Sequence, residues 1–171
     1  VRDIRSTLGY INGEFKTYAI DCGSKEFEAL MNSSNGYDYV LNLSALKHVR
    51  SEKDPYTLMR MLMVNVFNTI ETVRLSKEMG AKKYFCVSTD KAANPVNIMG
   101  ASKSLMEKVA VAKSRGSKKT IINATRYGNV MGSRGSVIPF FMSKNSEGVL
   151  PITHPEMTRF NISLQAGVDM V

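Results

Sequence analysis

Short apolar segments alternate with longer amphipathic segments along most of this chain, and this alternation restricts the possible folds more than any other feature. The apolar segments have the length and composition of strands. The expected strands are residues 16–20, 37–43, 83–87 and 120–125. The expected helices are residues 24–32, 56–78 and 98–114. Because strands and helices that alternate in this way form right-handed βαβ units, the sequence predicts an α/β fold with a parallel sheet.

The longest expected helix, residues 56–78, carries apolar residues at three- and four-residue spacing. These residues are Met59, Met63, Val66, Ile70 and Val73. Such a stripe usually faces the core, and methionine fits irregular gaps there. We therefore expect these methionines to fill the core. Gly80 is expected to end this helix, and Ser24 to cap the helix at residues 24–32.

Polar side chains follow each expected strand. They are Asp21, Ser44, Ser88, Thr89 and Arg126. The carboxyl ends of parallel strands meet at one edge of a sheet, and ligands of open α/β sheets bind in a crevice along that edge. The sequence therefore predicts a ligand site where these side chains gather.

The stretch from Ser88 to Lys103 concentrates groups that transfer protons. Asp90 and Lys91 are adjacent, and Lys103 follows twelve residues after Lys91. An adjacent acid and base can serve one substrate when the environment tunes both groups, or they can form an ion pair on a surface loop. Lys103 lies in the first turn of a helix, against the helix dipole. It either binds a ligand or points into solvent, and both alternatives stay open on these residues alone.

Two loops beyond the expected strand ends offer groups that suit a diphosphate or a sugar. The candidates are Lys47, His48, Arg126, Asn129, Arg134 and Ser136. A lone histidine is more often structural than catalytic. An ordinary loop with a solvent-facing arginine is the alternative for the second group.

The formal net charge of +8 favours an anionic partner. The basic residues are scattered and no nucleic-acid-binding motif is present, so a nucleic-acid partner is not expected. Cys22 and Cys86 match no metal spacing, which predicts reduced thiols in a cytoplasmic protein and no metal site. The N-terminal VRDIRST lacks signal-peptide character, and no apolar run reaches the roughly 18 residues of a membrane span. The G-x-G-x-x-G turn of dinucleotide-binding sheets is also absent.

Five motifs, taken in order, resemble the extended short-chain dehydrogenase/reductase family. They are ALKHV, STDKAANP, MGASK, RYGNVMGSRGSVIPFF and PITHPEMTRF. Within that family the sequence is similar to the UDP-N-acetylglucosamine 4,6-dehydratases and related capsular polysaccharide biosynthesis proteins of bacteria. The resemblance implies one partial NAD(P)-binding domain over residues 1–171, with a Rossmann-like doubly wound parallel sheet. It further implies that the first βα unit and most of the substrate domain are missing, and that residues 129–171 begin the substrate-binding part.

The resemblance also implies a set of binding residues. Those for NAD or NADP are Asp21, Cys22, Leu43, Ser44, Ala45, Asn65, Ser88 and Lys103. Those for UDP-N-acetylglucosamine or a related UDP-hexose are Lys47, His48, Arg126, Asn129, Arg134 and Ser136. By position, Asp21 resembles the family's contact to the adenine ring, and Lys103 resembles the lysine that holds the nicotinamide ribose.

The catalytic residues implied by the resemblance are Thr89, Asp90, Lys91 and Met99. Most family members carry a tyrosine at the position of Met99, and its phenol removes a hydroxyl proton. Methionine has no titratable proton, so Thr89 and Asp90 are expected to handle the C4 hydroxyl proton. Lys91 is expected to remove the C5 proton, and Asp90 to protonate the departing C6 hydroxyl.

Two other functions stay open at this point. The first is a nucleotide-sugar epimerase on the same scaffold, which the missing tyrosine and the adjacent acid–base pair disfavour. The second is a non-catalytic dinucleotide-binding module. A homo-oligomer is expected, with membrane anchoring only if a further N-terminal region provides it.

Overall fold

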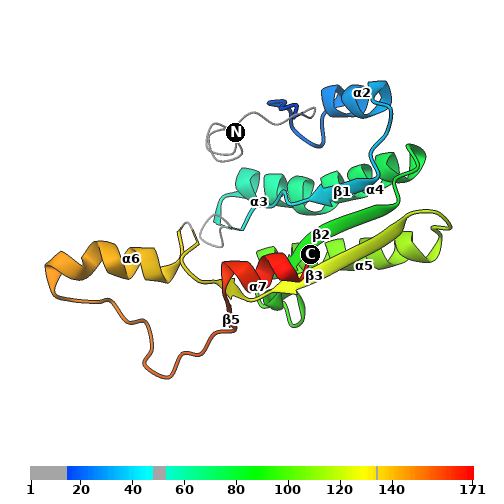
Figure 1. The fold of residues 1–171 in the computed structure, drawn as a ribbon. Coiled ribbons are helices and arrows are strands. Elements are labelled where there is room, and N and C mark those ends of the chain that lie inside the picture. The colour runs from blue at the N-terminus through cyan, green and yellow to red at the C-terminus, as the bar shows by residue number, and fades with distance from the viewer. Residues whose placement is uncertain (1–14, 48–52, 134) are drawn as a thin grey trace.

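Three parallel strands form the central sheet of the computed structural model, which describes residues 15–47, 53–133 and 135–171. The strands are β1 (Tyr39–Asn42), β2 (Lys83–Thr89) and β3 (Ile121–Tyr127), and β2 lies in the middle (Figure 1). A separate parallel pair joins β4 (Asn129–Val130) to β5 (Asn161–Ile162). The parallel α/β sheet predicted from the sequence is thus confirmed, and the three long strands end at one edge.

Helical segments connect these strands. They are α2 (Lys25–Ser33), α3 (Pro55–Leu62), η2 (Met63–Phe67), α4 (Asn68–Glu78), η3 (Asp90–Ala92), α5 (Ile98–Arg115), α6 (Val137–Lys144), η4 (Asn145–Glu147) and α7 (Leu164–Asp169). Ser24 caps α2 as predicted, because its hydroxyl accepts a hydrogen bond from the Phe27 amide at 3.2 Å. Asn97 caps α5 in the same way, with a bond of 2.8 Å from the Gly100 amide. Gly80, at a φ of +79°, follows the end of α4.

The core lies between one face of the sheet and helices α4 and α5, which contact β2 and each other. Its buried residues are Val73, Tyr84, Cys86, Met106, Ala110 and Ile122. Tyr84 is fully buried, and its hydroxyl is bonded to Asn42 at 2.9 Å and to Thr72 at 2.8 Å. Because a buried hydroxyl without a partner is costly, this network fixes β1, β2 and α4 in one arrangement.

The strand predicted at residues 16–20 is not present, so that prediction was wrong. A strand is stable only when a neighbour pairs with its backbone groups. Within the part of the chain that the structure describes, β1 pairs with β2 alone. Residues 16–20 run as irregular chain up to Asp21.

The helix expected at residues 56–78 contains a π-helical segment, η2, between α3 and α4. The predicted core positions Met59 and Met63 are 63% and 46% exposed, so the expectation that they fill the core was wrong. A π segment adds a residue to the turn, which shifts the helix face that meets the core. The neighbouring Met61 and Val64 are buried instead.

The C-terminal part of the chain leaves the sheet and returns to it. Helix α6 lies away from the three long strands, and an irregular segment leads back to β5 and α7 (Figure 1). Gly128 permits the close approach of the returning chain, because a Cβ at this position would lie 2.4 Å from the backbone oxygen of Phe160. The Tyr127 hydroxyl donates to the Gly167 oxygen of α7 at 2.5 Å. No helix among the described residues is both long and apolar enough to cross a membrane.

Candidate active site

The predicted acid–base pair lies where β2 ends and the short helix η3 begins. The Lys91 ammonium donates from Nζ to Oδ1 of Asp90 at 3.0 Å, and the Thr89 hydroxyl donates to the same oxygen at 2.9 Å. The side chains of Lys91 and Asp90 are 36% and 24% exposed, so both are accessible from solvent. The Lys91 ammonium and the Thr89 hydroxyl therefore share one oxygen of the Asp90 carboxylate.

Asn129 completes the surroundings of Lys91. Its Oδ1 accepts a second hydrogen bond from the Lys91 Nζ, also at 3.0 Å. Asn129 is the first residue of β4, which follows the carboxyl end of β3. The ammonium is thus held between a carboxylate and an amide oxygen. Such double contact fixes the direction of the amine, which a catalytic base requires.

Hydrogen bonds decide the charge of Asp90. Burial raises the pKa of this carboxyl, but the hydrogen bonds from Lys91 and Thr89 outweigh burial, and the pKa lies below its ordinary value. Asp90 is therefore a carboxylate at neutral pH in the free protein. It must receive a proton before it can act as an acid.

Lys103 reaches the same strand end from α5. It is only 6% exposed, and its ammonium donates to the Val87 oxygen at 2.9 Å and contacts the Met106 sulfur at 3.6 Å. Burial lowers the pKa of Lys103, although the nearby Cys86 and Glu107 act in the opposite direction. The alternative of a lysine that points into solvent is excluded by this burial.

Asn65, in the π-helical segment, ties the loop after β1 to α5. Its side chain accepts from the Leu46 amide and donates to the Leu46 oxygen, both at 3.0 Å, and it also donates to the Ser102 hydroxyl at 3.0 Å. Ser102 in turn donates to the Met99 oxygen at 2.8 Å. The predicted residues Asn65 and Met99 are therefore both buried at the junction of three segments.

The N-terminal cofactor candidates gather at a hollow of about 300 Å³ between α2 and β1. Cys22, Leu43 and Ser44 all line it, although they come from two separate loops. Ser44 is held by Asn42, whose Oδ1 accepts from the Ser44 hydroxyl at 2.6 Å. This hollow is the space that the described residues offer for a cofactor near β1.

Asp21 lies beside this hollow with partners of its own. Its carboxylate binds the Arg60 guanidinium and accepts from the Asn68 amide at 3.2 Å. The hydrogen bond from Arg60 is the main reason why the pKa of Asp21 lies below its ordinary value. Its predicted contact with an adenine ring stays a prediction.

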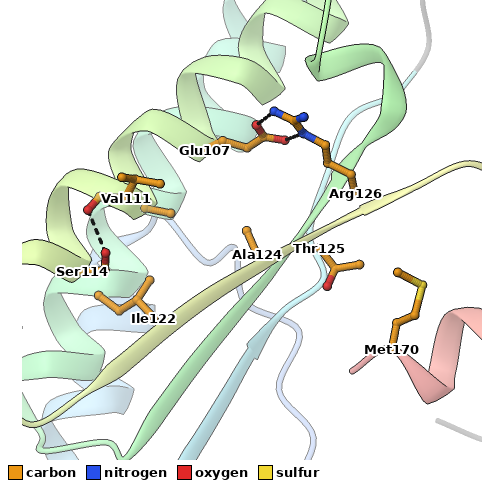
Figure 2. Close-up of a pocket in the computed structure, with 9 residues that line it drawn as sticks. Glu107, Val111, Ser114, Ile122, Ala124, Thr125, Arg126 and Met170 are labelled. Atoms are coloured by element: carbon orange, nitrogen blue, oxygen red, sulfur yellow. Dashed lines mark hydrogen bonds and ion pairs between the residues drawn. The ribbon is translucent and has the colours of Figure 1, made fainter.

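Ser88 and Arg126, which were predicted to bind cofactor and substrate, meet at a residue that the sequence reasoning missed. The Glu107 carboxylate accepts from the Ser88 hydroxyl at 2.5 Å. It also binds the Arg126 guanidinium through two hydrogen bonds of 2.8 and 2.6 Å (Figure 2). The signal that could have found Glu107 is its spacing, since it lies four residues after Lys103 on the same helix and so shares its face.

The other substrate candidates do not approach Lys91 as Asn129 does. Ser136 occupies the N-cap position of α6, but its buried hydroxyl has no hydrogen-bond partner among the described residues. Lys47 is exposed in the loop after β1, as is Ala45, which was predicted to bind the cofactor. His48 and Arg134 lie outside the described residues.

A second hollow of about 480 Å³ runs between α5 and the free edge of β3, with Met170 on its far side (Figure 2). The Glu107–Arg126 pair lies at one end of it. Neither this hollow nor the one beside β1 is lined by Thr89, Asp90 or Lys91. The candidate active site is therefore assigned from its chemistry and from its place at the strand ends.

A parallel sheet with proton-transferring groups at its carboxyl edge defines an open α/β protein that binds its ligand along that edge. The chain belongs to the polysaccharide biosynthesis protein family, whose model matches residues 15–171. This membership confirms the resemblance seen in the motifs.

Individual relatives differ in their activities. The chain is 43% identical over 151 residues to a UDP-N-acetylglucosamine 4,6-dehydratase (inverting) of Campylobacter jejuni, a match that covers 86% of this chain and 45% of the relative. It is 40% identical over 172 residues to a UDP-glucose 4-epimerase of Rickettsia conorii, which covers 99% of this chain and 49% of that relative. The chain thus spans about half the length of these curated relatives.

A solved structure shares the fold. The dTDP-glucose 4,6-dehydratase DesIV of Streptomyces venezuelae, with NAD bound, matches with a TM-score of 0.69 at 22% identity. The match covers 84% of this chain and 49% of that one. At this identity the match establishes the Rossmann-like fold.

Proposed function

We propose that the complete protein is an NAD(P)-dependent 4,6-dehydratase that converts UDP-N-acetylglucosamine to a UDP-4-keto-6-deoxy sugar in polysaccharide or glycan biosynthesis. One observation carries the proposal: Lys91 and Asp90 are in contact at 3.0 Å, at the carboxyl edge of the sheet. Elimination of water needs a base and an acid at neighbouring carbons of one substrate. The relative from Campylobacter jejuni, which is named for this reaction, supports the choice of substrate.

The bound NAD(P)⁺ would supply the acceptor for the C4 hydride and the donor that returns this hydride to C6. Cys22, Leu43, Ser44 and the buried Lys103 are the residues that would hold it. The hollow beside β1 supports the assignment of the first three, which line it. NAD-containing DesIV, which shares the fold, agrees with this cofactor class.

The hydrogen bonds of Thr89 support a route for the C4 hydroxyl proton. As C4 is oxidised, the Thr89 oxygen accepts this proton and passes its own to Asp90 along the 2.9 Å bond. Asp90 then donates this proton to the departing C6 hydroxyl, which leaves as water. Met99, which has no titratable proton, takes no part in the transfer.

Lys91 acts at C5 in the same sequence. For this step the Lys91 ammonium, whose side chain is 36% exposed, first releases one proton to solvent and becomes the amine that acts as the base. The amine removes the C5 proton, and the C5–C6 double bond forms as the hydroxyl leaves. Lys91 then returns a proton to C5, so the product differs from the substrate by one water.

The rival reaction is epimerisation at C4, because a UDP-glucose 4-epimerase is also among the relatives. The two reactions differ in one measurable quantity, which is the mass of the product. Incubation of the complete polypeptide with UDP-N-acetylglucosamine should give a product lighter by one water, whereas an isomer of unchanged mass supports the epimerase. Cofactor binding without turnover of any UDP-hexose supports a non-catalytic module.

The two cysteines bear on where in the cell the enzyme works. We propose that the enzyme works in the cytoplasm, and the free thiols Cys22 and Cys86 support this. Burial raises the pKa of Cys86 to about 11, which keeps the thiol protonated and unreactive. The expected homo-oligomer stays a prediction.

A further inference from the structure

We propose that Ser88, Glu107 and Arg126 form a clasp that positions the catalytic residues, and that Arg126 acts through this clasp without contacting the substrate. The inference rests on the proposed function of Thr89, Asp90 and Lys91. Three hydrogen bonds of 2.5 to 2.8 Å converge on the Glu107 carboxylate. They join β2, α5 and β3 at the edge where the catalytic groups emerge.

The position of Ser88 gives the clasp its effect. Ser88 is only 3% exposed and directly precedes Thr89 in β2, so its hydroxyl holds the end of the strand that carries the catalytic groups. The residue before it, Val87, is held by Lys103 through a bond of 2.9 Å. Helix α5 therefore binds two consecutive residues of β2, one through Lys103 and one through Glu107.

The charge of Glu107 makes the clasp strong. Burial raises the pKa of this carboxyl, but the hydrogen bonds from Arg126 and Ser88 outweigh it and lower the pKa below its ordinary value. The carboxylate is thus charged at neutral pH, and a two-pronged arginine contact to a carboxylate is stronger than a neutral hydrogen bond. The Glu107 side chain is 15% exposed, whereas that of Arg126 is 51% exposed.

Loss of the arginine would leave a shielded carboxylate without its counter-charge. Glu107 would then turn toward solvent or take another partner, and Ser88 would lose its acceptor. A shift of about 1 Å at a reacting group can reduce turnover about 10²-fold. The clasp therefore predicts a loss in kcat, because the chemistry is disturbed while the substrate-binding surface is kept.

The test measures kcat and KM for UDP-N-acetylglucosamine in the complete polypeptide with Arg126→Gln, Ser88→Ala and the double variant. We expect each single change to lower kcat about tenfold or more, with KM within about twofold, and the double variant to be no worse than the poorer single one. Additive losses would overturn the proposal. So would a rise in KM with kcat unchanged in Arg126→Gln alone, since that result would show a direct substrate contact.

Arg74→Gln is the matched control. Arg74 is another arginine held by carboxylates, and it joins α4 to Glu28 of α2 and to Glu78, each at 2.6 Å. Because its partners lie on α2 and α4, the control should leave kcat unchanged. A similar loss of kcat in Arg74→Gln would show that the effect is general destabilisation, and it would overturn the positioning role.

Hydrogen exchange separates this proposal from the proposed function. Backbone amides of residues 88–91 should exchange faster in Arg126→Gln and Ser88→Ala than in the wild type and in Arg74→Gln. This readout does not depend on which reaction the enzyme catalyses. Wild-type protein that releases no water contradicts the proposed function, whereas unchanged exchange at residues 88–91 contradicts the clasp.

Discussion

Gly100 offers a sharp test of how the acid–base pair is positioned. This glycine lies in the first turn of α5, packed against the backbone of Lys91. A Cβ at position 100 would lie 2.7 Å from the Lys91 oxygen, about 0.7 Å less than the 3.4 Å at which ordinary contact begins. Because this nearest neighbour is a backbone atom, Gly100→Ala must move η3, and Lys91 with it.

Gly100→Ala should change stability much less than it changes turnover. Alanine in a helix is favoured over glycine by up to about 1 kcal/mol, while overpacking costs about 1 to 3 kcal/mol. The free energy of unfolding should therefore fall by no more than about 3 kcal/mol. Turnover should fall far more, by about 10²-fold, because the required shift approaches 1 Å at the base.

The assay compares water release from UDP-N-acetylglucosamine with urea unfolding, both on the complete polypeptide. Gly116→Ala is the matched control, since Gly116 caps the other end of α5 and an added Cβ would meet nothing within 4 Å. Its turnover should equal that of the wild type. Turnover of Gly100→Ala within about twofold of the control would refute the reasoning that this contact positions Lys91.

Four further predictions concern single residues. Lys91→Ala should lower turnover about 10²-fold or more, as expected for loss of a general base, with cofactor binding by fluorescence unchanged; near-normal turnover would remove Lys91 from that role. Met99→Leu should keep turnover within about tenfold, because the volume is nearly conserved at this buried position; a collapse in turnover would show a direct role for the thioether. Tyr84→Phe should cost about 1 to 3 kcal/mol in urea unfolding, because Asn42 and Thr72 lose a buried partner; an unchanged midpoint would contradict this. The pKa of Glu107 lies below its ordinary value of 4.5, so its contribution to stability is present above that pH and is lost as the pH falls through the folded-state pKa; Glu107→Gln should flatten the stability profile in that range, and an unaltered profile would contradict the prediction.

Local signals in the sequence predicted most of the fold. The apolar runs became β1, β2 and β3, and the capping residue Ser24 marked the start of α2. These features depend on residues close in the sequence, so the sequence alone reveals them. The strand expected at residues 16–20 failed because pairing depends on a distant neighbour, which composition does not disclose.

The candidate site was predictable in its residues but less so in its contacts. Asp90 and Lys91 are adjacent in the sequence, so their ion pair was one of the expected alternatives. The contact of Asn129 with Lys91 joins residues far apart in the chain, and the carboxylate of Glu107 depends on how α5 lies across β2 and β3. The exposure of Met59 follows from a π segment that a period of 3.6 residues does not anticipate.

The most direct test of the central claim is the reaction of the complete polypeptide with UDP-N-acetylglucosamine in D₂O, followed by mass spectrometry. A dehydratase that uses Lys91 at C5 should give a product that lacks one water and carries one deuterium at C5. An isomer of unchanged composition without deuterium would contradict the account, because it would show that hydride transfer at C4 proceeds without elimination.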